Sequence, residues 1–195
     1  MDLRVEKTRK SIVNAFIALR AKKPLEKITV KELCEYAMIN KSTFYSHYAD
    51  IYNLSDTLET EVVSSIIQTL EQPGYLFDNT ERATKELFLA FLSQNHLIQI
   101  LFSGSRSSSL IYKIEQQLKK IFFQKHPEYK NDLSKNIGIS YAIYGTYYSF
   151  MEHQNYDQEQ VIFLLGRISQ YAADLLVHAP AHQENSSESA DARLL

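Results

Sequence analysis

Apolar side chains recur at intervals of three and four residues along most of this 195-residue chain. That period places them on one face of an α-helix, whereas a half-buried strand requires apolar and polar residues to alternate. Only five glycines and four prolines interrupt the pattern, and no extended alternation of Val, Ile and Thr occurs. The spacing therefore predicts an all-α fold.

Local signals mark the ends of the first two helices. A first helix is expected over residues 3–21, because Pro24 prevents it from continuing. Thr29 and Glu32 have the spacing of a capping box, in which the hydroxyl and the carboxylate both satisfy free backbone N–H groups. We therefore expect a short second helix over residues 30–37.

A third short helix is apolar on one side and polar on the other. Met38 and Ile39 are expected to form a tight turn, and Asn40 is a favourable N-cap for a helix that ends near Tyr48. Phe44 and Tyr48 lie four residues apart and would form its inner face. The sides and the outer face would carry Lys41, Ser42, Thr43, Tyr45, Ser46 and His47.

The rest of the chain is predicted to form mostly longer helices. Asp50 would cap one over residues 51–71, which a Gln-Pro-Gly stretch then ends. Residues 179–195 lose the apolar period and are rich in Ser, Ala and acidic residues, which is typical of a disordered tail. The remaining helices are expected near 80–94, 96–103, 107–125, 131–153 and 157–178.

Charge is distributed unevenly along the chain. Residues 1–50 carry ten Lys and Arg against six Asp and Glu, a balance of +4. The remaining residues carry eleven against seventeen, a balance of -6, so the chain as a whole is close to neutral at -2. This asymmetry favours contact between a polyanion and the N-terminal segment alone.

Several classes of protein are disfavoured by what the sequence lacks. No uncharged apolar run approaches the roughly 20 residues that a membrane span requires, and the charged start has no apolar signal segment. A single cysteine, Cys34, excludes an internal disulfide framework and a cysteine-cluster metal site. We therefore expect a cytoplasmic protein that does not associate with membranes.

Catalytic motifs are also missing. The chain has no glycine-rich phosphate loop, no Gly-x-Ser-x-Gly and no His-Glu-x-x-His. His178 and His182 have the spacing of a helical metal pair, but Pro180 lies between them. We expect a protein that is not an enzyme and holds neither a metal nor a cofactor.

Two short helices joined by a tight turn, with a basic helix before them, form a helix-turn-helix candidate. The second helix of such a motif is anchored by large apolar residues and offers hydroxyls, a cation and hydrogen-bonding aromatics to a DNA groove. Residues 40–48 meet this requirement. A helical interaction protein that never touches DNA is an alternative, and the polar outer face at 41–47 disfavours it.

The residues themselves carry a resemblance to a known family. The segments ITVKELCEYA (28–37) and INKSTFYSHY (39–48) resemble the N-terminal domain of the TetR/AcrR transcriptional regulators. The match covers about residues 5–60, and its Thr-Phe-Tyr-x-His-Tyr core is specific, whereas the remainder matches only in layout. The resemblance implies an all-α homodimer with a three-helix DNA-binding head (1–50) and a larger helical body (51–178) for effector binding and dimerisation.

The same resemblance assigns roles to individual residues. Thr29 and Lys31 would approach phosphate at the start of the second helix, where backbone N–H groups add to the contact. Phe44, Tyr48 and Leu33 would anchor the core, with Cys34 as a small buried residue. The candidate DNA contacts are Thr29, Lys31, Lys41, Ser42, Thr43, Tyr45, His47 and Tyr52.

Two positions depart from the family pattern. Met38 occupies a turn position that is usually Gly, and Met tolerates a positive φ less well, so the turn is expected to be rearranged or strained. Ile51 stands where many members have a phosphate-binding Lys at the start of the fourth helix. Because the adjacent Tyr52 offers only a neutral hydrogen bond, DNA binding should depend less steeply on salt.

The body is rich in aromatic residues, and two interpretations stay open. The first is a helical core with a dimer interface. The second adds an apolar pocket for a small-molecule effector, with Phe91, His96, Phe102, Tyr141, Tyr144 and Tyr148 as candidate lining residues.

By the same resemblance, the last two helices would form a four-helix bundle with those of a second subunit. Gly138 and Gly145 would allow close approach of helices on the first of them. The second would contribute the stripe Ile162, Leu165, Ile168, Ala172 and Leu176.

The predicted function is that of a TetR-like transcriptional regulator. Its most direct form is a repressor that a small-molecule effector releases from a pseudo-palindromic operator in double-stranded DNA. The alternative is a TetR-like coactivator, or a regulator controlled by a protein partner, whose aromatic body is a docking surface.

Overall fold

Helices are the regular secondary structure of the described part of the chain. The computed structural model describes residues 3–70 and 79–178, in which no strand occurs, and this confirms the all-α prediction. The α-helices of these described residues are α1 (Leu3–Arg20), α2 (Val30–Ala37), α3 (Lys41–Tyr45), α4 (Ile51–Gln68), α5 (Thr80–Ser93), α6 (Asn95–Leu101), α7 (Ser109–Lys125), α8 (Leu133–Glu152) and α9 (Gln158–His178). Short 3-10 turns lie at Leu25–Lys27, Gly104–Arg106 and Pro127–Tyr129.

Most helix ends lie within two residues of their predicted positions. Two are earlier: the third helix ends at Tyr45 instead of near Tyr48, and α4 ends at Gln68 instead of near residue 71. The predicted Gln-Pro-Gly stop and the predicted tail, 179–195, lie outside the described residues.

Polar side chains cap the N-termini of α2, α3 and α4, and Asn79 and Asp132 cap α5 and α8 in the same way. Asn40 Oδ1 accepts from Thr43 N at 2.7 Å, and Asp50 Oδ1 accepts from Asn53 N at 2.7 Å. Thr29 Oγ1 accepts from the N–H of Glu32 at 3.2 Å, which is the hydroxyl half of the predicted capping box.

The carboxylate half of the predicted capping box is not observed among the described residues. Glu32 Oε2 instead lies 2.5 Å from Lys23 Nζ, in an ion pair. The carboxylate therefore ties the start of α2 to the segment that follows α1.

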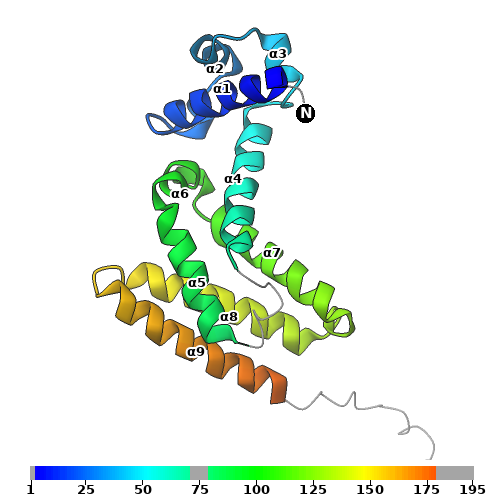
Figure 1. Ribbon diagram of the computed structural model, residues 1–195, viewed down its shortest axis with the longest axis vertical. Coiled ribbons are helices and arrows are strands. Elements are labelled where there is room, and N and C mark those ends of the chain that lie inside the picture. Colours follow the sequence, from blue (N-terminus) through cyan, green and yellow to red (C-terminus); the bar gives the residue numbers. More distant parts are fainter. Residues whose placement is uncertain (1–2, 71–78, 179–195) are drawn as a thin grey trace, which may run out of the picture.

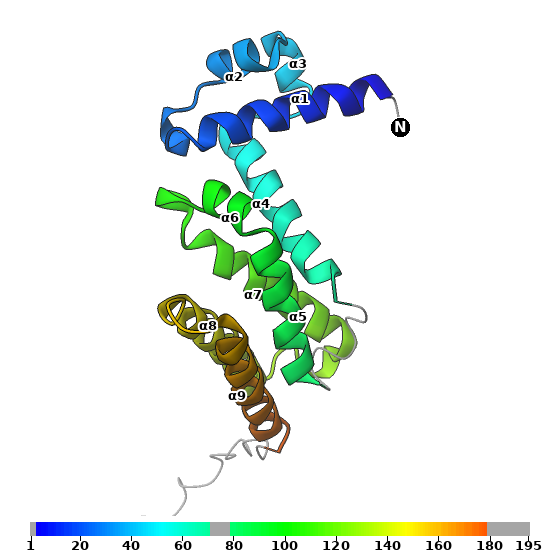
Figure 2. The ribbon, with the colours of Figure 1, turned by 60° about the vertical axis from the view of Figure 1, so that its left-hand side comes forward.

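The helices divide visibly along the long axis of the molecule. Figure 1 shows α1, α2 and α3 gathered at one end, α4 running from them into the remainder, and α8 and α9 side by side near the other end. Figure 2 shows the same separation from another direction, with α5 and α7 between α4 and the α8–α9 pair. None of the described helices is long and apolar enough to span a bilayer.

The N-terminal helices enclose apolar side chains of their own. Ile12 and Phe16 from α1 are fully buried with Leu33 from α2 and Phe44 from α3. Tyr48 is buried beside Phe44, with ring centroids 6.0 Å apart. The predicted anchors Phe44, Tyr48 and Leu33 are therefore in the core, and Cys34 is buried as well.

A glycine that the sequence analysis did not identify lies at the contact between α5 and α9. Gly166 of α9 lies so close to α5 that an added Cβ would be 3.1 Å from the backbone oxygen of Glu81. The side chain of Gln170, one turn later, accepts a hydrogen bond from the N–H of Thr80 at 2.8 Å. This close contact fixes the first turn of α5 against α9.

Candidate nucleic-acid interface and effector cavity

The turn between α2 and α3 is tight and strained. Met38 adopts φ 53° and ψ 45°, the left-handed region that favours glycine. Its side chain is 91% exposed, so no packing compensates for the strain. The N–H of Ile39 reaches back to the carbonyl of Cys34 at 3.0 Å, and Ser11 Oγ of α1 donates to the carbonyl of Ala37 at 2.9 Å. Hydrogen bonds from Ile39 and from Ser11 thus hold the turn. Of the two predicted outcomes, the turn is strained and not rearranged.

Asn40 organises the N-terminal turn of α3. Its Oδ1 accepts from the hydroxyls of Ser42 and Thr43, both at 2.7 Å, as well as from the Thr43 N–H. The two hydroxyls are thus held in fixed orientations. The sequence predicted Asn40 as a cap but not this second role, which the Asn-x-Ser-Thr spacing could have indicated.

The eight candidate DNA-contacting residues come from three neighbouring segments. Thr29 and Lys31 lie at the start of α2, and Tyr52 lies at the start of α4 with 56% of its surface exposed. On α3, Tyr45 is 55% exposed while its neighbour Phe44 is fully buried. Of the eight, Thr43 and His47 are half-buried, and the exposed residues are Thr29, Lys31, Lys41, Ser42, Tyr45 and Tyr52.

Charged contacts join α1 to α4 behind these segments. Arg9 of α1 binds both carboxylate oxygens of Glu61 on α4, at 2.5 and 2.6 Å. This hydrogen bond raises the pKa of Arg9. The Tyr48 hydroxyl is buried beside the same arginine, and burial raises the pKa of Tyr48.

A second polar joint connects α1 to the segment between α6 and α7. The buried Arg20 donates to Ser103 Oγ at 2.9 Å and to the carbonyl of Leu101 at 3.3 Å. Its pKa is lowered by burial. Glu26 accepts a hydrogen bond from the Ser105 hydroxyl, which adds a second contact between the same two regions.

The α6–α7 segment also binds α4 through a buried carboxylate. Glu59 of α4 is fully buried and accepts from Arg106 at 2.8 and 2.5 Å. Ser55 and Ser109 donate to the same carboxylate at 2.8 and 3.1 Å. Hydrogen bonding to Glu59 raises the pKa of Arg106. Residues 101–109 therefore contact both α1 and α4.

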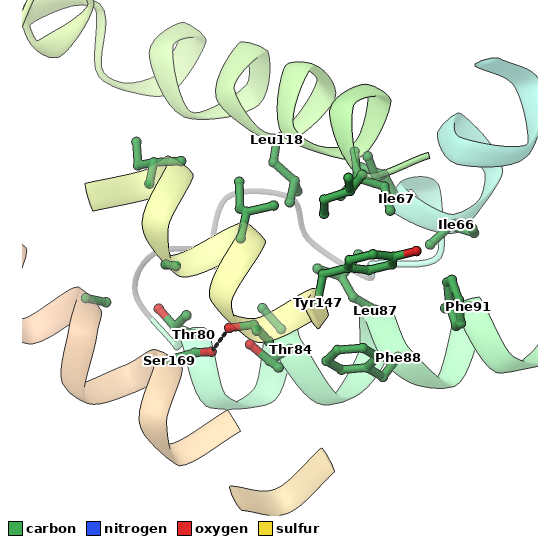
Figure 3. Close-up of a pocket in the computed structure, with 18 residues that line it drawn as sticks. Ile66, Ile67, Thr80, Thr84, Leu87, Phe88, Phe91, Leu118, Tyr147 and Ser169 are labelled. Carbon is green, nitrogen blue, oxygen red and sulfur yellow. Dashed lines mark hydrogen bonds between the residues drawn. The ribbon is translucent and has the colours of Figure 1, made fainter. Parts of the chain in front are cut away.

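A cavity of about 160 Å³ lies among α4, α5, α7, α8 and α9. Most of its 18 lining residues are Ile, Leu, Ala and Phe, and none of those in the described part of the chain is charged. Five carry hydroxyls: Thr80, Thr84, Thr146, Tyr147 and Ser169. In Figure 3, Thr80, Thr84 and Ser169 lie at one end, whereas Ile66, Phe91 and the Tyr147 ring lie toward the other.

The predicted effector-pocket residues lie mostly outside this cavity. Phe91 lines it, but His96, Phe102, Tyr141, Tyr144 and Tyr148 do not. His96 is exposed on α6, and Phe102 is buried in the core. The α8 residues Ala142, Ile143, Thr146 and Tyr147 line the cavity. They lie on the face of α8 opposite the three predicted tyrosines.

Those three tyrosines belong to the outer side of α8. Tyr141 and Tyr148 are 76% and 55% exposed. The Tyr144 hydroxyl donates to Glu115 of α7, which also accepts from Ser140 at 2.6 Å. Burial would raise the pKa of Glu115, but hydrogen bonds from Ser140, Lys119 and Tyr144 outweigh it and lower that pKa. Tyr144 therefore contacts α7, Tyr141 and Tyr148 are exposed, and none of the three lines the cavity.

An apolar surface remains exposed on α8 and α9. Ile137 and Tyr141 of α8 are 60% and 76% exposed, and Leu164 and Ile168 of α9 are 51% and 60% exposed. Apart from the neighbouring backbone of α8 itself, no described atom lies within 4 Å of a Cβ added to Gly145, which is on the exposed side of α8.

The predicted interface stripe on α9 only partly coincides with this surface. Ile168 belongs to it, whereas Ile162 and Leu165 are buried within the subunit. Ala172 is half-buried, and the side chain of Leu176 lies outside the described residues. The predicted stripe is thus divided between the core and the surface, because α9 carries apolar residues on both faces.

Among the described residues no group of three or more His, Cys, Asp and Glu side chains is arranged to hold a metal ion. His182, the second member of the spaced histidine pair, lies outside the described residues. No family model, no curated protein and no solved structure matches this chain.

Proposed function

We propose that this chain is a homodimeric transcriptional regulator similar to the TetR/AcrR family, and that it represses until an effector releases it from a pseudo-palindromic operator. The observation that carries this proposal is the short helix α3. Phe44 anchors it on one side at 0% exposure, and Lys41, Ser42 and Tyr45 are exposed on the other. A helix of this kind fits the major groove and offers a cation and hydroxyls to base edges and phosphates.

The flanking segments supply backbone contacts to the same duplex. Thr29 and Lys31 surround the N-terminus of α2, where free N–H groups attract phosphate. Tyr52 adds a neutral donor at the start of α4. Such contacts fix the position of the protein on DNA, whereas α3 reads the sequence.

A second copy of the chain would cover the exposed apolar surface of α8 and α9. Ile137, Tyr141, Leu164 and Ile168 all belong to that surface. An interface of this kind is isologous, and it presents two α3 helices related by a two-fold axis. The operator is then pseudo-palindromic, with half-sites about one helical turn of roughly 34 Å apart, or a multiple of it.

The effector acts through the spacing of the two DNA-binding ends. The cavity takes Ile66 and Ile67 from the C-terminal part of α4, and the N-terminus of α4 lies next to α3. An occupant that fits only one position of α4 shifts the population toward that position. A coupling of about 1–3 kcal/mol between the two sites is enough to change operator affinity 5- to 150-fold.

Substitutions on α3 test this function. Lys41→Ala and Tyr45→Ala should each weaken binding to DNA from upstream of the protein's own coding region in a mobility-shift titration. Both side chains are exposed, so helicity and dimerisation should not change. Lys120→Ala, an exposed lysine on α7, is the matched control. Equal retention of DNA by all three variants would exclude α3 as the reading helix.

The exposed tyrosines of α8 favour a second candidate, in which a protein partner controls the regulator. Tyr141 and Tyr148 are exposed and lie outside the cavity, on a side of α8 open to docking. In this alternative the chain is a TetR-like coactivator or a regulator released by a protein. A pull-down that recovers a partner in one-to-one stoichiometry, lost in Tyr141→Ala, would favour it.

A further inference from the structure

The cavity has a chemical polarity that restricts what it binds. Its hydroxyl-bearing residues come from the N-terminus of α5, from α8 and from α9, and Thr146 and Ser169 are hydrogen-bonded to each other at 3.1 Å. In Figure 3 the dashed line that starts at Ser169 marks this hydrogen bond, close to Thr80 and Thr84. The remaining wall is aliphatic and aromatic. One end is therefore weakly polar and the rest is apolar.

One hydroxyl at the polar end lacks a partner. Thr80 Oγ1 is buried from solvent and makes no hydrogen bond within the part of the chain that the structure describes. Buried polar atoms are nearly always satisfied, so an exception in a cavity wall indicates a missing partner. The N–H of Thr80 is already bound to Gln170, so the group without a partner is the hydroxyl.

Charged ligands do not suit these walls. No Lys, Arg, His, Asp or Glu is among the lining residues of the described chain. An ion buried without a counter-charge loses its hydration and recovers little in return. A threonine hydroxyl can donate to a carbonyl or accept from a hydroxyl, and either is neutral.

The volume sets the size of the occupant. A dry apolar cavity of about 150 Å³ holds one benzene molecule, and this cavity measures about 160 Å³. We propose that the cavity binds a neutral molecule about the size of one substituted ring, whose single hydroxyl or carbonyl oxygen hydrogen-bonds Thr80 Oγ1. This inference deepens the regulator proposal, on which it rests for the role of the occupant as effector.

Three probes of similar shape test the inference on the full chain without DNA. Toluene, p-cresol and benzoate are titrated by calorimetry, with thermal unfolding as a second readout. We expect p-cresol to bind about three- to tenfold more tightly than toluene, since a net hydrogen bond contributes that much. Benzoate should bind at least about tenfold more weakly than toluene.

Variants then assign the preference to one atom. Thr80→Val should remove the advantage of p-cresol over toluene without lowering the melting temperature, because the hydroxyl has no partner to lose. Thr57→Val, on the outer part of α4, is the matched control and should keep the advantage. Ala142→Leu, which adds volume at the cavity wall, should weaken both neutral probes.

Three results would overturn the inference: no binding of either neutral probe, benzoate binding as tightly as p-cresol, or an unchanged preference in Thr80→Val. None of them bears on DNA binding. A chain that binds p-cresol but no DNA would overturn the regulator proposal and leave the cavity inference standing. A chain that binds DNA but neither neutral probe would overturn the cavity inference alone.

Discussion

At the scale of single residues, the turn before α3 illustrates how one side chain sets local strain. Met38 holds a left-handed conformation that costs an L-residue about 1–2 kcal/mol, and its exposed side chain recovers nothing by packing. Asn40, two residues later, orients the hydroxyls of Ser42 and Thr43. The start of α3 is therefore defined by a residue with a strained backbone, Met38, and by a hydrogen-bonded cap, Asn40.

Met38→Gly should raise the free energy of unfolding by about 0.5–1 kcal/mol. Glycine removes the left-handed penalty, although part of the gain is lost to the greater freedom of the unfolded chain. Chemical denaturation measures the change as a higher midpoint at constant m-value. Met38→Ala keeps the β-carbon and should leave stability nearly unchanged. Equal stabilisation by both variants would show that φ 53° is not the source of the strain.

At the scale of elements, residues 101–109 join two α-helices and one 3-10 turn. This segment contacts α1 through Arg20, α4 through Glu59, and the 3-10 turn after α1 through Glu26. The Glu59 carboxylate is fully buried, so its ion pair with Arg106 has little competition from water. The segment thus connects α6 and α7 to both α1 and α4.

Arg106→Ala should destabilise the protein by about 3–5 kcal/mol, because it leaves a buried carboxylate without its counter-charge. Adding Glu59→Gln should recover part of this loss, since the remaining group is then neutral. Denaturation of the single and double variants measures the coupling. Lys31→Ala, which removes an exposed pair with Glu35, should cost no more than about 0.5 kcal/mol. A similar cost for Lys31→Ala and Arg106→Ala would contradict this account.

Helix α8 shows where prediction from sequence succeeds and where it stops. Its ends lie within two residues of the predicted bounds 131–153, and Asp132 caps its N-terminus. Its orientation could not be predicted, since one face carries Ala142, Ile143 and Tyr147 while the opposite face carries Tyr141 and Tyr148. Both faces are apolar, so the period alone does not say which one turns inward.

The N-terminal helices were more readily predicted. Asn40 and Asp50 mark helix starts through their own side chains, and Phe44 differs clearly in polarity from its neighbours. The ion pair of Glu32 with Lys23 and the close contact at Gly166 depend on chain segments meeting in space. Local sequence carries no signal for such contacts.

At the scale of the whole molecule, the N-terminal helices lie far from the α8–α9 pair, with α4 between them (Figure 2). In the proposed dimer the exposed surface of α8 and α9 is buried against a second copy, and the two α3 helices are displayed at the opposite ends. Exposed apolar surface of this kind marks an interaction site in a protein that is otherwise well packed.

Ile168→Asp should convert the protein from a dimer to a monomer, because it places a charge in the apolar surface of α9, where Ile168 is 60% exposed. Light scattering after size-exclusion chromatography measures the mass. Leu89→Asp is the matched control, as Leu89 is 52% exposed on α5. A monomeric parent protein, or an equal loss of mass in both variants, would contradict the proposed interface.

The central claim is that α3 reads DNA as one half of a symmetric pair. The most direct test is selection of duplexes from a random-sequence pool by the full chain, followed by titration of the recovered DNA at several salt concentrations. The account predicts a pseudo-palindromic consensus, two protomers per duplex, salt-dependent binding, and loss of enrichment in Lys41→Ala. Recovery of no common sequence, or of one that Lys41→Ala selects equally well, would contradict it.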